Sequence, residues 1–321
     1  MNGVLNLYKP SGPTSHDVVA RVRRVVGMKR VGHAGTLDPM ARGVLVVCLG
    51  AATRIIEYWS ELPKSYVAEM VLGIATDTQD TTGQVIAERP AGGVREADLR
   101  AVLGRFRGPI LQVPPMVSAV KHAGERLYRL AREGREVARA PRPVTIHALE
   151  CREFQPGERP RARLAVTCSS GTYVRTLCAD IGDALGTGAA MSDLERTAVG
   201  PFRVEESLSL DDLAALAAAG RLSERLISPA DALAHLPAVV LDDAACRAVM
   251  QGQTIPGGEG AKGRGGDTAG RDVSPSRPLA PSPPRVVRLL NSQGELIALA
   301  RVQEQDGMVR LAPEKVFGAP A

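Results

Sequence analysis

An aspartate in a glycine-rich loop is the residue of this sequence best placed to do chemistry. Asp38 lies in the run GHAGTLDPMARGVL, residues 32–45, which ends in an uninterrupted apolar stretch. A loop directly before a buried strand is held by the scaffold, and its glycines let another backbone come close. An ionised carboxylate held there could act as a nucleophile or as a base. Aspartate before proline is also a common turn former, so the dipeptide alone leaves both interpretations open.

The cysteines and histidines of the sequence do not form a recognisable metal site. The five cysteines include no CxxC pair and no histidine at ligand spacing, so we expect neither a disulfide framework nor zinc. We interpret them as small buried residues in a reducing compartment. They are Cys48, Cys151, Cys168, Cys178 and Cys246. Without a His/Cys/Cys signature, zinc-dependent base modification is disfavoured, and without a GxGxxG run so is a Rossmann methyltransferase.

Composition and charge describe a globular protein that is compatible with a polyanionic partner. Hydrophobic residues make up 44% of the chain, and no apolar run reaches the roughly 18 residues of a membrane helix. The N-terminal residues lack the features of a secretory signal, so we expect a cytoplasmic protein. The net charge of +5 is too small to prove nucleic-acid binding, although basic residues cluster at 21–30 and 121–142.

The hydrophobic pattern around Asp38 predicts the strands and helices that hold it in place. Residues 3–8 read as a strand, and a helix capped by Thr14 or Ser15 follows with its valines on one face. Residues 32–43 form a loop, 44–49 a central strand, 76–83 a polar turn, and Tyr66 begins another strand. Further helices are expected at 96–106, 125–133, 172–185 and 211–219, and further strands at 143–154 and 162–168. The pattern favours an α+β fold with a mixed, largely antiparallel central sheet flanked by helices.

The character of the sequence changes after Pro237. Short strands are predicted at Val286–Leu290 and Glu295–Val302, which suit a small β domain. Residues 256–284 are rich in Gly, Pro and Ser and have almost no large apolar side chain. We expect this stretch to be a disordered insertion, because it cannot bury enough surface to offset its ordering entropy.

Five stretches of the sequence resemble motifs of one enzyme family. The run around Asp38 is similar to the catalytic loop of the TruB family of pseudouridine synthases. The other four are similar to its N-terminal, base-stacking, arginine and pocket-closing motifs: KPSGPTS (9–15), KSY (64–66), SGTYVRTL (170–177) and LERTAVGPF (194–202). The match extends from residue 3 to about residue 210, with the motifs in order and at family spacing.

The resemblance implies a reaction, and the reaction has clear demands. Converting uridine to pseudouridine breaks the glycosidic C–N bond, turns the detached uracil and forms a C–C bond. No net redox change occurs, so no cofactor is expected. The reaction needs an ionised carboxylate, a flat surface that grips an extruded base, and a closed cavity that retains the free uracil.

The resemblance also implies which residues meet these demands. Asp38 would be the catalytic carboxylate and Arg175 its paired arginine, whose charge favours the ionised aspartate. Tyr66 would stack on the uracil, Tyr173 would lie beneath the base or sugar, and Leu194 would supply an apolar wall. His33 would contact the RNA near the flipped nucleotide. Without the resemblance, we would interpret the tyrosines and Leu194 as packed core residues and His33 as a loop imidazole.

The family likeness further implies an architecture and a partner. We expect a pseudouridine synthase domain at 1–236, with an RNA-gripping insertion at 113–143, and a β-barrel-like PUA-type RNA-binding domain at 237–321 that the 256–284 insertion interrupts. The expected substrate is uridine 55 in the T-loop of tRNA, and the expected state is a monomer that uses no metal and no membrane. Two alternatives stay open: a module that binds or folds tRNA, and a relative of the guide-RNA-dependent synthases.

Overall fold

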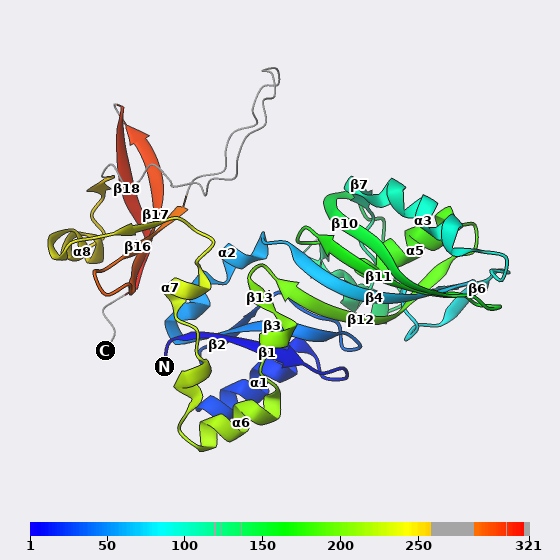
Figure 1. The fold of residues 1–321 in the computed structure, drawn as a ribbon, viewed down its shortest axis with the longest axis horizontal. Coiled ribbons are helices and arrows are strands. Elements are labelled where there is room, and N and C mark those ends of the chain that lie inside the picture. Colours follow the sequence, from blue (N-terminus) through cyan, green and yellow to red (C-terminus); the bar gives the residue numbers. More distant parts are fainter. Residues whose placement is uncertain (119, 123, 136, 258–285, 306, 318–321) are drawn as a thin grey trace. The chain divides into compact units, whose positions relative to one another are not determined.

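A computed structural model describes residues 1–118, 120–122, 124–135, 137–257, 286–305 and 307–317 (Figure 1). The predicted insertion at 256–284 lies outside these residues, except for its first two positions. None of the helices in the described parts of the chain is long and apolar enough to span a bilayer.

Contacts divide the chain into two compact units. The larger unit contains Asn6–Val47 and Ile56–Leu222, and the smaller unit contains Met1–Leu5, Cys48–Ile55 and Ser223–Ala321. Every residue predicted for the site falls in the larger unit. The N-terminal strand and the strand that follows Asp38 each have residues in both units.

The larger unit is built on a nine-stranded mixed sheet, as the sequence predicts. Its main path runs β1-β3-β12-β4-β11-β10-β7, while β2 pairs with β3 and β13 with β12. β3 and β12 are parallel, and β12, β4, β11, β10 and β7 are successively antiparallel. The strands are β1 (Gly3–Lys9), β2 (Val31–Ala34), β3 (Arg42–Leu49), β4 (Lys64–Leu72), β7 (Gly108–Gln112), β10 (Arg142–Gln155), β11 (Arg161–Cys168), β12 (Ala189–Val199) and β13 (Phe202–Arg203).

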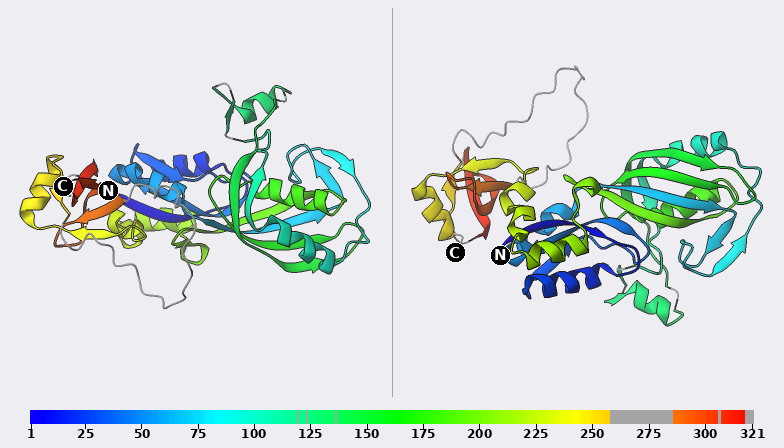
Figure 2. Two further views of the ribbon diagram at one scale, coloured as in Figure 1. Left: turned by 90° about the horizontal axis from the view of Figure 1, so that it is seen from above. Right: turned by 60° about the horizontal axis from the view of Figure 1, so that its bottom comes forward.

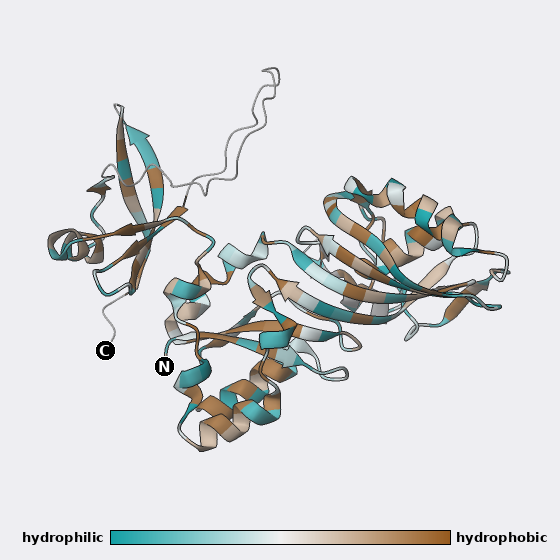
Figure 3. Ribbon diagram, in the orientation of Figure 1, coloured by the Kyte–Doolittle hydropathy of each residue, from teal (hydrophilic) through white to brown (hydrophobic). Residues whose placement is uncertain are grey.

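Burial along the strands explains their sequences. β3 is buried at seven successive positions from Gly43, whereas β11 alternates between exposed or half-buried and buried positions, and its inward side chains face the core. Figure 3 shows the same contrast in hydropathy. Helices α3 (Glu96–Leu103) and α5 (Val174–Ala184) cover one face of the sheet (Figure 2), and their leucines join those of β4 and β11 in one core.

The remaining elements of the larger unit are short, apart from the first helix. α1 (Ser15–Val26) begins at Thr14, which forms a reciprocal capping box with Asp17. Its valines 18, 19 and 22 are buried. The others are α2 (Glu57–Ser60), β5 (Ile74–Thr76), β6 (Val85–Glu88), η2 (Gly104–Phe106), β8 (Lys121–His122), β9 (Glu125–Arg126), α4 (Leu127–Arg132), η3 (Val204–Glu206) and α6 (Leu210–Ala218).

Two elements near the site differ from the sequence-based prediction. Residues 32–34, expected to be loop, belong to strand β2, which pairs with β3. β12 was not predicted as a strand at all. It carries charged residues because its outward side chains find partners on neighbouring strands, such as Arg42 for Asp193 and Glu69 for Ser192. These cross-strand pairs replace the simple apolar alternation that would have marked it.

The smaller unit has its own sheet and core. The sheet order is β14-β16-β17-β18-β15, with β14 and β16 parallel and the other pairs antiparallel. Val249 of α8 packs with buried residues of these strands. Its elements are η1 (Gly50–Ile55), η4 (Leu222–Arg225), α7 (Pro229–Ala232), β14 (Ala238–Val240), α8 (Asp243–Met250), β15 (Ile255–Pro256), β16 (Val286–Leu290), β17 (Leu296–Gln305) and β18 (Met308–Val316).

Candidate active site

The loop that carries Asp38 is fixed by side chains from distant parts of the larger unit. It connects β2 to β3, and the Ser15 hydroxyl accepts a hydrogen bond from the Leu37 amide at 2.9 Å. On the other side, the Lys9 ammonium donates to the carbonyls of Pro39 at 3.2 Å and Ala41 at 2.6 Å. The aspartate therefore stands on a backbone that is held on both of its sides.

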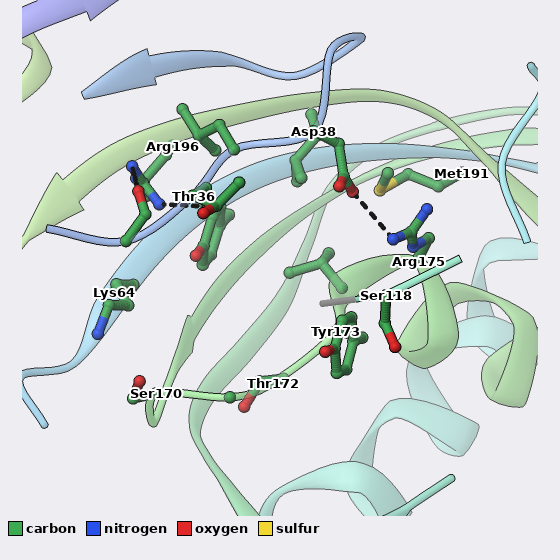
Figure 4. Close-up of a pocket in the computed structure, with 16 residues that line it drawn as sticks. Thr36, Asp38, Lys64, Ser118, Ser170, Thr172, Tyr173, Arg175, Met191 and Arg196 are labelled. Atoms are coloured by element: carbon green, nitrogen blue, oxygen red, sulfur yellow. Dashed lines mark hydrogen bonds and ion pairs between the residues drawn. The ribbon is translucent and has the colours of Figure 1, made fainter. Parts of the chain in front are cut away.

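Arg175 pairs with Asp38, as the sequence resemblance implies. It is the second residue of α5, and its Nη2 lies 3.3 Å from Asp38 Oδ2. The arginine side chain is 5% exposed, whereas that of Asp38 is 38% exposed. Figure 4 shows the carboxylate directed toward the guanidinium. The carboxylate is thus open to a ligand while the charge that faces it is buried.

A second carboxylate, Asp80, shares the same arginine. Its Oδ2 lies 3.3 Å from Arg175 Nη1, and its side chain is 4% exposed. Its Oδ1 accepts hydrogen bonds from the Thr78 hydroxyl at 2.9 Å and the Thr82 amide at 3.0 Å. Sequence reasoning described 76–83 only as a polar turn and missed this residue. The two aspartates among threonines in TDTQDTTG were the available signal.

The turn that presents Asp80 is attached to α5 at two successive residues. Thr176 donates to the Gln79 amide oxygen at 2.6 Å, next to the contact between Arg175 and Asp80. Gln79 has φ 65°, the one positive φ of a non-glycine residue in the described parts of the chain. Such backbone strain persists where the surroundings enforce it. Here the helix enforces the position of Asp80.

The Asp38–Arg175 pair lies on the wall of a cavity of about 270 Å³. The cavity brings together five of the six predicted site residues, namely Asp38, Tyr66, Tyr173, Arg175 and Leu194. Met191, Ser118, Lys64 and Arg196 also line it and were not given roles from the sequence. The volume is near the lower end for sites that bind small molecules, which suits one base and its sugar.

The two tyrosines of the cavity are positioned by different means. Tyr66 lies on β4 with its ring 9% exposed, and burial raises the pKa of its hydroxyl, so the ring stays neutral at physiological pH. Tyr173 precedes α5, and its backbone is held by Gln112 of β7, whose side-chain oxygen accepts from the Tyr173 amide at 3.0 Å. The Gln112 amide group donates back to the Tyr173 carbonyl at 3.2 Å. β7 therefore holds the Tyr173 backbone at the start of α5, while Tyr66 is held by burial within β4.

His33 does not line this cavity. It lies on β2, and its Nδ1 is buried with no hydrogen-bond partner among the described residues. Burial lowers the pKa of His33, and the charge of Arg196 lowers it further. The imidazole is therefore neutral at pH 7, and its role stays a prediction.

Three buried cations surround the loop that carries Asp38, and each binds main-chain carbonyls. They are Lys9, Lys64 and Arg196, and none has a carboxylate within ion-pair distance among the described residues. Burial lowers the pKa values of both lysines to about 8. Across the described ranges, no three His, Cys, Asp or Glu side chains gather so as to hold a metal ion.

Comparison with known proteins identifies the chain. Residues 23–174 match the N-terminal domain of TruB family pseudouridylate synthase, and residues 175–235 match the C-terminal domain of tRNA pseudouridylate synthase B. These matches define the class as pseudouridine synthase. The tRNA pseudouridine synthase B of Moorella thermoacetica is 46% identical over 98% of this chain and 99% of its own length. That of Symbiobacterium thermophilum is 52% identical over 78% and 82%. The chain belongs to the TruB family.

Solved structures show the same fold. A structure titled as a Cbf5-Nop10-Gar1 complex matches with a TM-score of 0.72 and 30% identity, over 98% of this chain and 84% of that one. An H/ACA RNP bound to a substrate RNA containing 2'-deoxyuridine matches with a TM-score of 0.70 and 28% identity, over the same shares. The α+β prediction is confirmed by these neighbours.

Proposed function

We propose that the chain converts uridine 55 in the T-loop of tRNA to pseudouridine, with Asp38 as the catalytic carboxylate. The observation that carries the proposal is the ionic pair of Asp38 with a buried arginine on the wall of a cavity faced by two tyrosines. The identity of 46% over nearly the full length to a tRNA pseudouridine synthase B supports tRNA as the substrate.

Each of the cavity residues has a separate role in the proposed reaction. An RNA base reaches such a site only if it is extruded from its stack. The Tyr66 ring then holds the uracil plane, and Tyr173 and Leu194 close the cavity around base and sugar. Asp38 assists the cleavage of the N1–C1′ bond. The retained uracil turns, the C5–C1′ bond forms, and the C5 proton is lost while N1 gains one, so atoms and electrons balance.

The same proposal assigns roles to the rest of the chain. His33 contacts the RNA beside the flipped nucleotide, and the insertion at 113–143 grips the T-arm. The C-terminal domain at 237–321 adds a PUA-like RNA contact. The enzyme acts as a monomer in the cytoplasm, where its tRNA substrate is found.

Replacing Asp38 with Asn tests the assignment directly. Asn preserves the shape of the side chain and removes the charge, so pseudouridine formation should be abolished while tRNA affinity stays near wild type. Purified proteins are incubated with an unmodified tRNA transcript, and pseudouridines are mapped chemically. The Asp211→Asn variant is the control, because Asp211 is 91% exposed on α6. Substantial turnover by the Asp38→Asn protein would refute the role of this carboxylate.

The same variant separates the proposal from its alternatives. If the chain only folds tRNA, wild type and Asp38→Asn should accelerate tRNA folding equally and neither should form pseudouridine. If it also catalyses, the substitution should abolish pseudouridine formation alone. Catalysis on bare transcript, with no guide RNA present, excludes the guide-dependent class. A wild-type protein that modifies nothing unless a guide is added would instead favour that class.

A further inference from the structure

Arg196 is buried beneath the loop that carries Asp38. Its side chain is 1% exposed, and its guanidinium donates to three main-chain carbonyls. Nε lies 2.8 Å from the Val44 oxygen, Nη2 lies 3.0 Å from that of Gly35, and Nη1 lies 3.3 Å from that of Thr36. Two of these carbonyls precede Asp38 and one follows it, so a single side chain closes the loop around the aspartate.

Burying the Arg196 guanidinium has an unfavourable desolvation free energy. Desolvating a guanidinium is costly, and Arg196 has no carboxylate partner in the part of the chain that the structure describes. A whole buried ion pair can often be replaced by apolar residues of similar size with no loss of stability, but Arg196 has no such pair among the described residues. The three hydrogen bonds offset part of the desolvation cost by satisfying main-chain carbonyls, and all three carbonyls belong to the segment that flanks Asp38.

The backbone of Arg196, on β12, also lies between β3 and β4. Arg196 is the antiparallel register partner of Tyr66 on β4 and the parallel partner of Gly43 on β3. At Gly43, an added Cβ would stand 2.3 Å from the Arg196 carbonyl oxygen, so the two backbones touch. Arg196 thus contacts both the strand that carries Tyr66 and the loop that carries Asp38.

We infer that Arg196 is a positioning residue, which holds the Asp38 loop at a fixed distance from Tyr66 and Arg175. This inference rests on the proposed function. Lys9 secures the other part of the loop, at Pro39 and Ala41, so the two cations hold complementary segments. Arg196 lines the cavity, but its side chain is 1% exposed and its three hydrogen-bond partners are protein carbonyls, so its effect on catalysis passes through the loop geometry.

We expect lysine to replace this guanidinium fork only in part. An ammonium is a compact charge with no planar spread of donors, so we expect it to lose part of the three contacts at Gly35, Thr36 and Val44. An Arg196→Lys protein keeps the charge and the ability to fold, while one end of the loop is released. A misplacement of about 1 Å at a catalytic group can cost on the order of 100-fold in rate.

The test compares the Arg196→Lys and Arg196→Met variants with wild type in three measurements: single-turnover rate on unmodified tRNA transcript, tRNA dissociation constant, and fraction folded at the assay temperature. Arg107→Lys is the matched control, since its guanidinium also donates to a carbonyl, that of Leu149, away from the cavity. We expect Arg196→Lys to lose about 100-fold in rate, with affinity and folded fraction unchanged.

Guanidinium ion at sub-denaturing concentration gives a further readout, with urea as its uncharged counterpart. Guanidinium should restore part of the rate of the Arg196→Met protein, and urea should not. If Arg196→Met does not fold, the Arg196→Lys comparison decides alone. The inference is overturned if Arg196→Lys turns over like Arg107→Lys, or if its loss of rate is matched by loss of affinity or of folded protein. An inactive wild type would instead refute the proposed function.

Discussion

At the residue scale, Arg175 faces two carboxylates at equal distances of 3.3 Å, and they differ in exposure. Asp80 is buried and satisfied by threonine hydroxyls and an amide, while Asp38 is open to the cavity. The buried member therefore orients the guanidinium, and the open member is the one that can meet a substrate. Asp80 thus fixes the position of Arg175, and Asp38 presents its charge to the cavity.

Replacing Asp80 with Asn should weaken both stability and turnover. Removing one partner of a buried ion pair typically costs about 3 kcal/mol, although Asp38 retains part of the interaction. Arg175 would then turn toward Asp38, and the carboxylate would be less available to the substrate. Urea unfolding measures the first effect and single-turnover kinetics the second. An Asp80→Asn protein as stable and as active as wild type would contradict this role.

Lys64 gives the larger unit a defined pH dependence. Burial lowers its pKa from 10.5 to about 8, and the Arg196 charge acts in the same direction. Between these values the unfolded chain binds more protons than the folded one, so this group makes the protein more stable as pH rises. The limit is about 1.4 kcal/mol per pH unit.

The difference in unfolding free energy between wild type and Lys64→Met isolates this effect. The unfolding free energy of wild type should rise relative to that of Lys64→Met as the pH is raised from 8 to about 10. Urea unfolding at each pH provides the measurement. A difference that stays constant across this range would show that the ammonium is not desolvated.

At the element scale, the close approach of β3 and β12 depends on Gly43. Its φ is +104°, and a Cβ would meet the Arg196 backbone at 2.3 Å and 2.8 Å. We expect Gly43→Ala to destabilise the protein by about 3 kcal/mol, through strain and through separation of the strands. The control is Gly93→Ala, where a Cβ meets nothing within 4 Å. Equal unfolding midpoints for the two variants would refute this account.

The insertion leaves and re-enters the sheet at one place, because Gln112 of β7 and Arg142 of β10 are register partners. Replacing residues 113–141 with a turn of about four residues should therefore preserve the fold of the larger unit. tRNA affinity should fall, since the basic residues of this segment are removed. Unfolding and filter-binding experiments measure the two effects. Loss of the folded state would show that the insertion belongs to the core.

The elements near the site show which parts of a fold a sequence reveals. α1 was predicted because a capping threonine and valines at helical spacing are local signals, and β3 because it is an unbroken apolar run. β12 was missed because its polar residues are satisfied by strands far along the chain. Asp80 was missed for the same reason, since the Arg175 that explains it is 95 residues away. The motif residues of the cavity were found through family resemblance, and local periodicity alone would have left them as core residues.

At the scale of the whole molecule, a net charge of +5 favours association with a polyanion, and the insertion concentrates basic residues. tRNA affinity should fall steeply as salt rises. Arg129→Ala, in the insertion, should lower the slope of the log–log plot by about 0.7–0.9 if that side chain meets a phosphate. Arg152→Ala is the control, because Arg152 pairs with Glu150 on β10. An unchanged slope for Arg129→Ala would place the phosphate contacts elsewhere.

The hydrogen bond from Arg175 Nη2 to the carbonyl of Val117, 2.6 Å long, connects the Asp38–Arg175 pair to the proposed RNA-gripping segment. The same Nη2 faces Asp38, and Val117 lies within the segment 113–143 that is proposed to grip the T-arm. A displacement of residue 117 would therefore rotate the guanidinium against the carboxylate. An RNA that displaces residue 117 would leave Arg175 misaligned with Asp38, whereas an RNA that fits would leave the pair aligned. If the segment 113–143 grips the T-arm as proposed, this shared donor would couple the seating of the RNA to the alignment of the ion pair.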